Sequence, residues 1–394
     1  MTAVRHLYLH MPFCRRRCPY CDYPVVATSS PDPSRWARAL AAELRLQAAV
    51  GLDLSRPDTL LVGGGTPSCL GAGLTGAVEA IVGAARLSRL SEWTVEANPE
   101  DIDEWLLEQW RRAGVTRVHI GVQSLRAGVL EWLGREHAPA AGLAAMMAAR
   151  RAGFWSWGVD VLFGLPPEID PGPMATLEGV IDAGAPHVSL HELALEPGTP
   201  LFTACQEGRF VPADADLVAD QYLACHEVLE DAGYKPYEMT SFARPSHRPV
   251  HIPATLGGAP WLGLGPGAHS RIRGRAVRNL REWQGYLGAL QGGKIPVSEA
   301  VAVEPGSPEV FWCRLRLADG IPRSELGAGG RGLADAWTAR GLALDARTRL
   351  RLAPAGWLRL DELADELARV ERRSRGPDRA GPPPPGRKRK RDGG

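Results

Sequence analysis

The sequence predicts an α/β protein with an open, partial (β/α)6 TIM-type barrel and a small, mostly helical, winged-helix-like C-terminal domain. Over the first 200 residues, six short apolar runs alternate with longer segments of helical periodicity, which is the pattern of parallel βαβ units. Polar and glycine-rich residues follow these runs, at the strand ends that carry the active site in β/α barrels. Six units are too few to close an eight-stranded barrel, so we expect an open one.

The expected strands are short runs rich in Val, Leu and Ile. They cover residues 7–10, 59–62, 93–97, 117–122, 157–163 and 187–193. Helices are expected between them, because apolar residues recur there at helical spacing among Ala, Glu and Arg. These helices cover residues 33–50, 74–87, 101–113, 126–152 (as two helices) and 173–183.

Beyond residue 200 the alternation stops, and the chain divides into further parts. A helix is expected over 214–232, and a hairpin over 351–357. The four expected parts are a barrel core, 1–235; an extension, 236–300; a winged-helix-like domain, 301–370; and a basic, proline-rich tail, 371–394. The tail cannot bury a core, so we expect it to be disordered.

Bulk composition excludes several classes of protein. Seven cysteines at irregular spacing in 394 residues are not a disulfide scaffold and favour a reducing, cytoplasmic location. No apolar run approaches the length of a membrane span, so no stable membrane span is expected. The formal charge of +1 indicates no nucleic-acid partner, and the basic run 387–391 is typical of a solvated tail.

A cluster of three cysteines follows the first strand. Cys14, Cys18 and Cys21 have C-x3-C-x2-C spacing, which can bind three irons of a [4Fe–4S] cluster and leave the fourth open. The alternative is a zinc ion bound by the three cysteines and a distant histidine such as His10. Zinc sites usually combine two C-x2-4-C pairs, and this sequence has no second pair, so the spacing favours the iron–sulfur cluster.

The segment from Tyr8 to Tyr23 around these cysteines resembles the opening of radical S-adenosylmethionine (SAM) proteins. More narrowly, it is similar to the branch with oxygen-independent coproporphyrinogen III oxidase and its haem-chaperone relatives. The resemblance extends over about residues 5–360. It rests on the motifs Val62-Gly-Gly-Gly-Thr-Pro67, Val95-Glu-Ala-Asn-Pro99, Gly121-Val-Gln-Ser124, Gly134-Arg-Glu-His137, Gly158-Val-Asp-Val-Leu-Phe-Gly-Leu-Pro166, Glu196-Pro-Gly-Thr199, Tyr237-Glu-Met-Thr-Ser-Phe242 and Gly263-Leu-Gly-Pro-Gly-Ala-His269.

The resemblance implies a set of cofactor contacts. Cys14, Cys18 and Cys21 would hold the cluster, and SAM on the open iron would be cleaved to a 5′-deoxyadenosyl radical with one electron from a donor such as flavodoxin or ferredoxin. The implied SAM-binding residues are Tyr8, Gly63, Gly64, Gly65, Thr66 and Glu96, with Gln123, Arg135 and Asp160 at a second SAM. Ordinary ion pairing at the barrel rim is the alternative role of the last three.

Two departures separate this chain from the relatives that it resembles. Tyr23 stands where the oxidase has a further cysteine, which points to the haem chaperones. The His-Asn-x-x-Tyr motif of those chaperones reads His251-Ile-Pro-Ala-Thr255 here, so His251 is the candidate haem ligand. We expect a haem-chaperone-like protein that binds haem or a related tetrapyrrole and delivers it to acceptors. The alternative is an enzyme that uses one or two SAM molecules for methyl or methylene transfer to a small molecule, as a methylase or cyclopropanase. A true coproporphyrinogen III dehydrogenase is less favoured.

Overall fold

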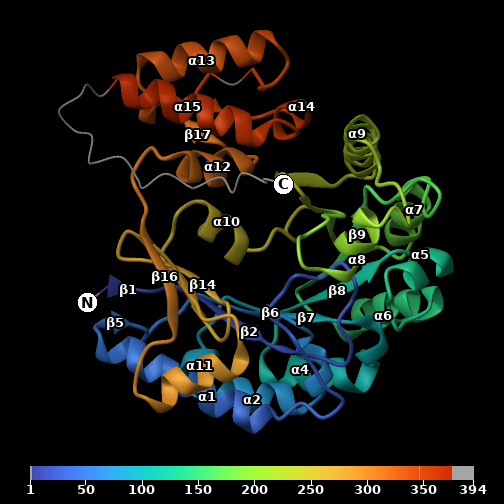
Figure 1. Ribbon diagram of the computed structural model, residues 1–394, viewed down its shortest axis with the longest axis vertical. Coiled ribbons are helices and arrows are strands. Elements are labelled where there is room, and N and C mark those ends of the chain that lie inside the picture. The colour runs from blue at the N-terminus through green and yellow to red at the C-terminus, as the bar shows by residue number, and fades with distance from the viewer. Residues whose placement is uncertain (1, 346, 375–394) are drawn as a thin grey trace. The chain divides into compact units, whose positions relative to one another are not determined.

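The computed structural model describes residues 2–345 and 347–374. The chain forms two compact units, Met1–Val303 and a second that begins at Glu304 (Figure 1). Most of the expected tail, residues 375–394, lies outside the described residues. No helix in the described ranges is long and apolar enough to cross a membrane.

The first unit is built on a twelve-stranded sheet with the order β11-β12-β10-β9-β8-β7-β6-β2-β13-β14-β15-β16. Its centre contains the six expected strands, each parallel to its neighbour. They are β2 (His6–Met11), β6 (Thr59–Gly64), β7 (Glu92–Ala97), β8 (Arg117–Gln123), β9 (Ser156–Phe163) and β10 (His187–Glu192). The prediction of an open, partial β/α barrel is confirmed. A seventh parallel strand, β13 (Trp261–Leu264), pairs with the free side of β2.

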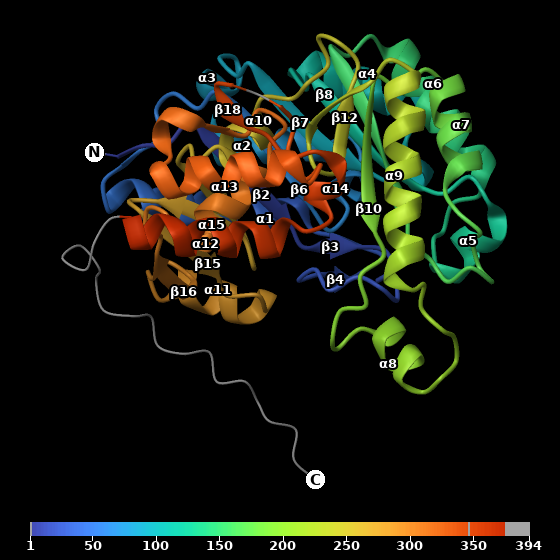
Figure 2. The same ribbon diagram turned by 90° about the horizontal axis from the view of Figure 1, so that it is seen from above.

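Helices follow these strands as the βαβ pattern predicts, and α1, α2 and α4 lie along one face of the sheet (Figures 1 and 2). Their bounds are α1 (Pro33–Ala49), α2 (Gly73–Val82), α3 (Ala84–Leu87), α4 (Glu104–Ala113), α5 (Ala127–Trp132), α6 (Pro139–Ala152), α7 (Met174–Asp182), α8 (Pro200–Gln206) and α9 (Ala215–Asp231). The carboxylates of Asp32, Asp103 and Asp214 accept hydrogen bonds from backbone N–H groups of the first turns of α1, α4 and α9. These N-caps determine where the three helices begin.

The two faces of the parallel strands differ in polarity. Apolar side chains such as Leu7, Leu9 and Val118 are fully buried, while the residues between them are polar. Successive side chains of a strand point to opposite faces, so one face of the sheet packs on the helices and the other carries polar groups. The partial barrel therefore has a polar inner surface.

The region after residue 234 completes the same sheet. The strands β11 (Lys235–Glu238) and β12 (Ser241–Ala243) pair antiparallel next to β10. Antiparallel strands β14 (His269–Ile272), β15 (Arg275–Asn279) and β16 (Val297–Ala302) extend the sheet beyond β13. The motif 263–269 includes the end of β13 and the start of β14. Helices α10 (His251–Leu256) and α11 (Trp283–Gln291) also belong here, with the short strand pairs β1 (Thr2–Ala3)–β5 (Leu52–Asp53) and β3 (Phe13–Cys14)–β4 (Val26–Ala27).

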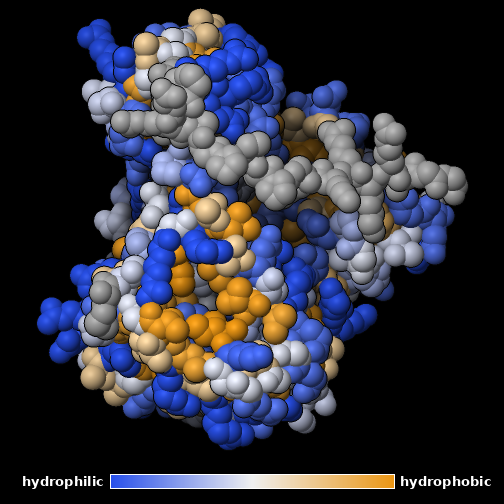
Figure 3. Space-filling view, turned by 60° about the vertical axis from the view of Figure 1, so that its left-hand side comes forward, coloured by the Kyte–Doolittle hydropathy of each residue, from blue (hydrophilic) through white to orange (hydrophobic). Residues whose placement is uncertain are grey.

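One face of the first unit has an apolar surface. Figure 3 shows apolar side chains gathered over its lower part. Among the exposed apolar side chains are Val297 and Val301 of the edge strand β16, all of whose residues are exposed.

The second unit is mostly helical, with a small antiparallel pair. It contains α12 (Pro308–Arg316), β17 (Ile321–Pro322), η3 (Arg323–Glu325), α13 (Ala328–Ala339), β18 (Arg349–Leu350), α14 (Pro354–Trp357) and α15 (Leu360–Ser374). The hairpin expected over 351–357 is wrong, because Ala343 bridges Leu352 and Pro354 begins a helix instead. The expected tail also starts too early: 371–374 are helical, and buried Glu371 accepts a hydrogen bond from Gly327 N at 2.8 Å.

Candidate cofactor site

The cysteine loop follows β2 and β3 at the C-terminal edge of the parallel sheet. Cys14 is buried, Cys18 and Cys21 are half-buried, and all three thiols are free. Backbone bonds fix the loop: Cys21 N donates to Cys18 O at 3.1 Å, and Leu201 N of α8 donates to Pro19 O at 2.9 Å. The loop that carries the three sulfurs is thus held by its own turn and by a neighbouring helix.

Two side chains from other segments of the chain donate to these sulfurs. Thr66 Oγ1 lies 3.3 Å from Cys14 Sγ, and Arg135 Nη1 lies 3.9 Å from Cys18 Sγ. Burial raises the pKa of Cys14 to about 11, although the Thr66 hydroxyl opposes the shift, and burial also raises the pKa of Cys21. Such thiols lose their protons when a metal supplies the compensating charge.

The donor set fits an iron–sulfur cluster better than a zinc ion. In the described ranges, no group of three or more His, Cys, Asp or Glu side chains is arranged to hold one metal ion. His10, the suggested fourth zinc ligand, contacts Tyr8 Oη at 2.9 Å through Nδ1 and Pro24 O at 3.3 Å through Nε2. A cluster takes one thiolate per iron, so its three cysteine sulfurs need not converge on a point.

The glycine turn after β6 packs directly against this loop. Gly65 N donates to Met11 O at 2.6 Å, and Thr66 N donates to Phe13 O at 2.8 Å. A Cβ on Gly65 would lie 2.6 Å from Phe13 O and 3.1 Å from Cys14 Sγ. Close approach of the two backbones therefore requires glycine at this position.

The two preceding glycines make room for side chains of the polar inner surface. A Cβ on Gly63 would lie 2.5 Å from the Glu96 carboxylate, and one on Gly64, at φ +106°, would overlap the His10 ring at Nδ1. Gly64 N donates to Glu96 Oε2 at 3.1 Å. Burial, and after it the charge of Asp160, raises the pKa of Glu96. The structure thus brings together the glycine turn, Glu96 and the cysteine loop.

Tyr8 and Tyr23 lie on either side of His10. Tyr8 is half-buried on β2, and burial, with the charge of Glu96 adding to it, raises its pKa well above the usual value. The Tyr23 ring stacks on the His10 ring at 6.5 Å between centroids and 18° between planes. Both rings therefore line the same corner of the inner surface as Glu96.

Gln123 ends β8 in a strained backbone conformation. Its φ is +64°, and the pairing of β8 with β9 shifts register between Ile120 and Gln123. A non-glycine residue in this region costs about 1–3 kcal/mol, and such strain clusters at functional sites. Gln123 therefore bends the chain at the C-terminal end of β8, the edge of the sheet at which the cysteine loop lies.

Arg135 and Asp160, the other two expected contacts of a second SAM, have protein partners here. Besides Cys18, Arg135 donates through Nη2 to Asn98 Oδ1 at 2.8 Å and to Gly121 O at 2.9 Å. Asp160 Oδ1 accepts from His119 Nε2 at 2.6 Å and from His191 Nε2 at 3.1 Å. Burial opposes the charged form of Asp160, but the two histidines outweigh it and hold its pKa well below the usual range.

His119 and His191 were not among the residues expected from the sequence. They lie on β8 and β10, on either side of β9. The signal that could have found them is the polar–apolar alternation in Arg117-Val-His119 and His187-Val-Ser-Leu-His191. That alternation places both rings on the polar face.

His251 lies away from these residues. It begins α10 and contacts Thr59 Oγ1, at the N-terminal end of β6, through Nδ1 at 2.8 Å. Its relative exposure is 3%, and burial lowers its pKa to about 3. The cysteine loop lies at the other end of the parallel strands, so the two candidate sites are separate.

A small, open pocket lies beside the cysteine loop. Its lining is strongly charged and comprises Arg15, Arg16, Cys18, Thr66, Asn98, Glu100, Asp101, Gly134, Arg135 and Glu136. A molecule in this pocket would therefore contact Cys18 next to Arg135.

Comparison with known proteins agrees with this geometry. The radical SAM superfamily matches residues 8–178. The heme chaperone HemW of Mycobacterium tuberculosis is 35% identical over 370 residues, which cover 92% of this chain and 94% of that protein. HemW of Escherichia coli strain K12 is 31% identical, covering 81% and 84%. The solved coproporphyrinogen III oxidase HemN from Escherichia coli has a TM-score of 0.73 and 21% identity, covering 92% of this chain and 89% of that one.

The open barrel with three free cysteines beside a glycine turn defines a radical SAM protein. Within that class, the chain belongs to the heme chaperone HemW family, because it matches two HemW proteins over most of their length. The likeness to HemN supports the fold.

Proposed function

We propose that this protein is a radical SAM haem chaperone. It binds a [4Fe–4S] cluster through Cys14, Cys18 and Cys21, binds SAM beside the glycine turn and Glu96, and passes haem or a related tetrapyrrole to acceptor proteins. The observation that carries the proposal is the packing of the cysteine loop on Gly65 and Thr66 at the strand ends. The names of the full-length relatives support the haem-transfer role.

Each group in this site has a definite task in the proposal. Cys14, Cys18 and Cys21 would hold the cluster, which would supply one-electron reduction of SAM. The glycine turn brings backbone groups close to the ligand, and the Glu96 carboxylate accepts from hydroxyl or amino donors. Tyr8 and Tyr23 shield one side of the site. A one-electron carrier such as flavodoxin or ferredoxin would provide the electron. The proposed location of the protein is the cytoplasm, whose reducing conditions suit its seven free cysteines.

Anaerobic reconstitution tests the cofactor part of the proposal. The protein should bind about four irons per chain and release 5′-deoxyadenosine when it is reduced with SAM. Cys18→Ser should reduce the iron content. Cys205→Ser, at a half-buried cysteine of α8, is the matched control and should retain it. A wild-type protein that takes up one zinc and no iron would contradict the proposal.

The haem part of the proposal does not rest on His251. Its ring is buried between Thr59 and His6, with the His6 centroid at 6.0 Å, and its backbone N donates to Glu92. Haem titration followed by the Soret band should give equal affinities for the wild type and His251→Ala. A folded His251→Ala variant without a Soret shift would restore His251 as the ligand, and no shift in either protein would exclude haem binding.

Methyl or methylene transfer with two SAM molecules is the competing function. It has less support, because Asp160 already accepts hydrogen bonds from two histidines and Arg135 faces Cys18. S-adenosylhomocysteine formed together with 5′-deoxyadenosine would favour this enzyme over the chaperone.

A further inference from the structure

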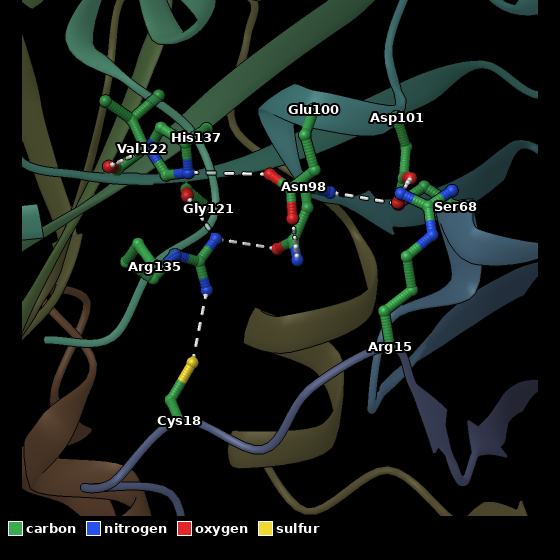
Figure 4. A network of polar contacts seen from close by, with 10 residues as sticks. All are labelled: Arg15, Cys18, Ser68, Asn98, Glu100, Asp101, Gly121, Val122, Arg135 and His137. Atoms are coloured by element: carbon green, nitrogen blue, oxygen red, sulfur yellow. Dashed lines mark hydrogen bonds and ion pairs between the residues drawn. The ribbon is translucent and has the colours of Figure 1, made fainter. Parts of the chain in front are cut away.

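Arg135 joins three sequence motifs at the cysteine loop. Figure 4 shows its guanidinium between Cys18, Asn98 and Gly121, each from a different segment. Arg135 N donates to Leu130 O at 2.9 Å, directly after the turn at Gly134 with φ +66°, and this turn aims the side chain at the loop. One end of the guanidinium is thus fixed, and the other end contacts a cysteine sulfur.

The acceptors that hold Arg135 are themselves held. Asn98 Nδ2 donates to Glu100 Oε1 at 3.0 Å, so Asn98 Oδ1 must face Arg135. Glu100 Oε2 lies 3.4 Å from Nδ1 of the buried His137, whose Nε2 lies 3.1 Å from Val122 O. The series His137–Glu100–Asn98 therefore fixes the position of the guanidinium (Figure 4).

The charge of Arg135 is not neutralised by a contacting carboxylate. Its two Nη2 acceptors, Asn98 and Gly121, are neutral, and none of the ion pairs among the described residues involves it. Arg15 of the same loop is different, because it pairs with buried Asp101 at 2.5 Å. Arg135 is thus a cation in direct contact with Cys18, and the nearest carboxylate, Glu100, reaches it only through Asn98.

A cation that donates to a ligating sulfur favours the reduced, more negative form of an iron–sulfur cluster. Hydrogen bonds to the sulfurs and local charge are among the factors that set the potential of such clusters. We propose that Arg135 is a positioning residue that raises the reduction potential of the cluster through Cys18, and that Asn98, Glu100 and His137 hold it there. This inference rests on the proposed function, because it requires the cluster.

A redox titration of the reconstituted full-length protein, followed by EPR in the absence of SAM, tests the proposal. Arg135→Gln keeps hydrogen-bonding groups and removes the charge. At the wild-type midpoint, its ratio of reduced to oxidised cluster should fall about tenfold, which is ~59 mV for a one-electron couple. Arg135→Lys keeps a charge and should shift the potential less. Arg126→Gln, at an arginine paired with Asp170 at 3.2 Å, is the control and should leave the potential unchanged.

Asn98→Ala provides a second test that leaves the guanidinium in place. It removes one of the two acceptors of Arg135 Nη2 and leaves Gly121 O, so we expect a smaller shift in the same direction. If Arg135→Gln does not retain iron, the reduction potentials of Asn98→Ala and Arg135→Lys test the proposal instead. Equal potentials in all variants would overturn the proposal. An unchanged potential with weaker SAM binding would also overturn it, by assigning Arg135 to SAM. A wild type without a cluster would instead contradict the proposed function.

Discussion

Gly65 is the residue at which the glycine turn and the cysteine loop come closest. In Gly65→Ala, the new Cβ would lie 2.6 Å from Phe13 O and 2.8 Å from Met11 O, and backbone oxygens cannot rotate away. We expect the free energy of unfolding to fall by about 1–3 kcal/mol, as for other overpacked sites. Iron uptake should fall as well, because the same Cβ displaces Cys14. Denaturant unfolding and iron analysis measure the two effects.

Gly76→Ala is the matched control for this substitution. Gly76 lies in α2, is exposed, and has no atom within 4 Å of a Cβ. Alanine should stabilise the helix by about 0.5–1 kcal/mol and leave iron uptake unchanged. Equal changes in stability and iron uptake for Gly65→Ala and Gly76→Ala would show that the close backbone contact at Gly65 does not require glycine.

Sequence patterns identify some site residues because local geometry dictates their type. The cysteine spacing and the three glycines are of this kind, since a short loop and a close backbone contact permit few alternatives. Pairing between strands is not local. His119 and His191 meet at Asp160 only because β8, β9 and β10 are neighbours, and Arg135 reaches Cys18 across 117 residues.

Glu43 connects α1 to the late strands and to α11. Its carboxylate accepts from Gly265 N at 2.9 Å, from Asn279 Nδ2 at 2.7 Å and from Tyr286 Oη at 2.6 Å. Burial raises the pKa of Glu43 to about 7, against the effect of these donors. One buried carboxyl thus holds three elements that are more than 200 residues distant in sequence.

This pKa predicts a pH-dependent stability. An unfolded glutamate titrates at about 4.3, so between pH 4.3 and 7 the folded Glu43 holds a proton that the unfolded chain has lost. Its contribution to stability is greatest below about pH 4.3 and is lost as the pH rises to 7, by up to about 4 kcal/mol.

Glu43→Gln isolates this effect, because glutamine does not titrate. The stability of the wild type minus that of Glu43→Gln, from urea unfolding, should decrease between pH 5 and pH 8. Subtraction removes the contributions of all other titrating groups. A difference that stays constant over this range would mean that Glu43 is already ionised at pH 5.

At the scale of elements, the six central strands are predictable and the late ones are not. Buried parallel strands with helices between them give a strong periodic signal. In contrast, β15 and β16 read Arg-Ala-Val-Arg-Asn and Val-Ser-Glu-Ala-Val-Ala; β15 is mostly half-buried, and β16 is exposed throughout. Without an alternation of buried and exposed residues, strand and loop cannot be distinguished. The pairing of β13 with β2 is also hidden from sequence patterns, because the paired residues, such as Trp261 and His6, are 255 apart in sequence.

At the scale of the whole molecule, the structure places the boundary between its units at residues 303 and 304. The sheet ends just before it: β16 ends at Ala302, and Val303 N donates to Gly274 O at 2.8 Å. The helices α12 and α13 pack on α15 within the second unit. All twelve strands of the large sheet and all candidate site residues lie before the boundary.

A chain that ends at Val303 should therefore fold and bind the same amount of iron as the full-length protein. A chain that ends at residue 235, where the sequence alone suggests the end of the barrel core, should fail. It lacks β13, the partner of β2, and the Gly265 and Tyr286 groups that hold Glu43. It would leave the edge of β2 unpaired next to the cysteine loop. Circular dichroism and iron analysis distinguish the two chains, and iron uptake by the shorter chain equal to that of the longer one would show that the extension is dispensable for the site.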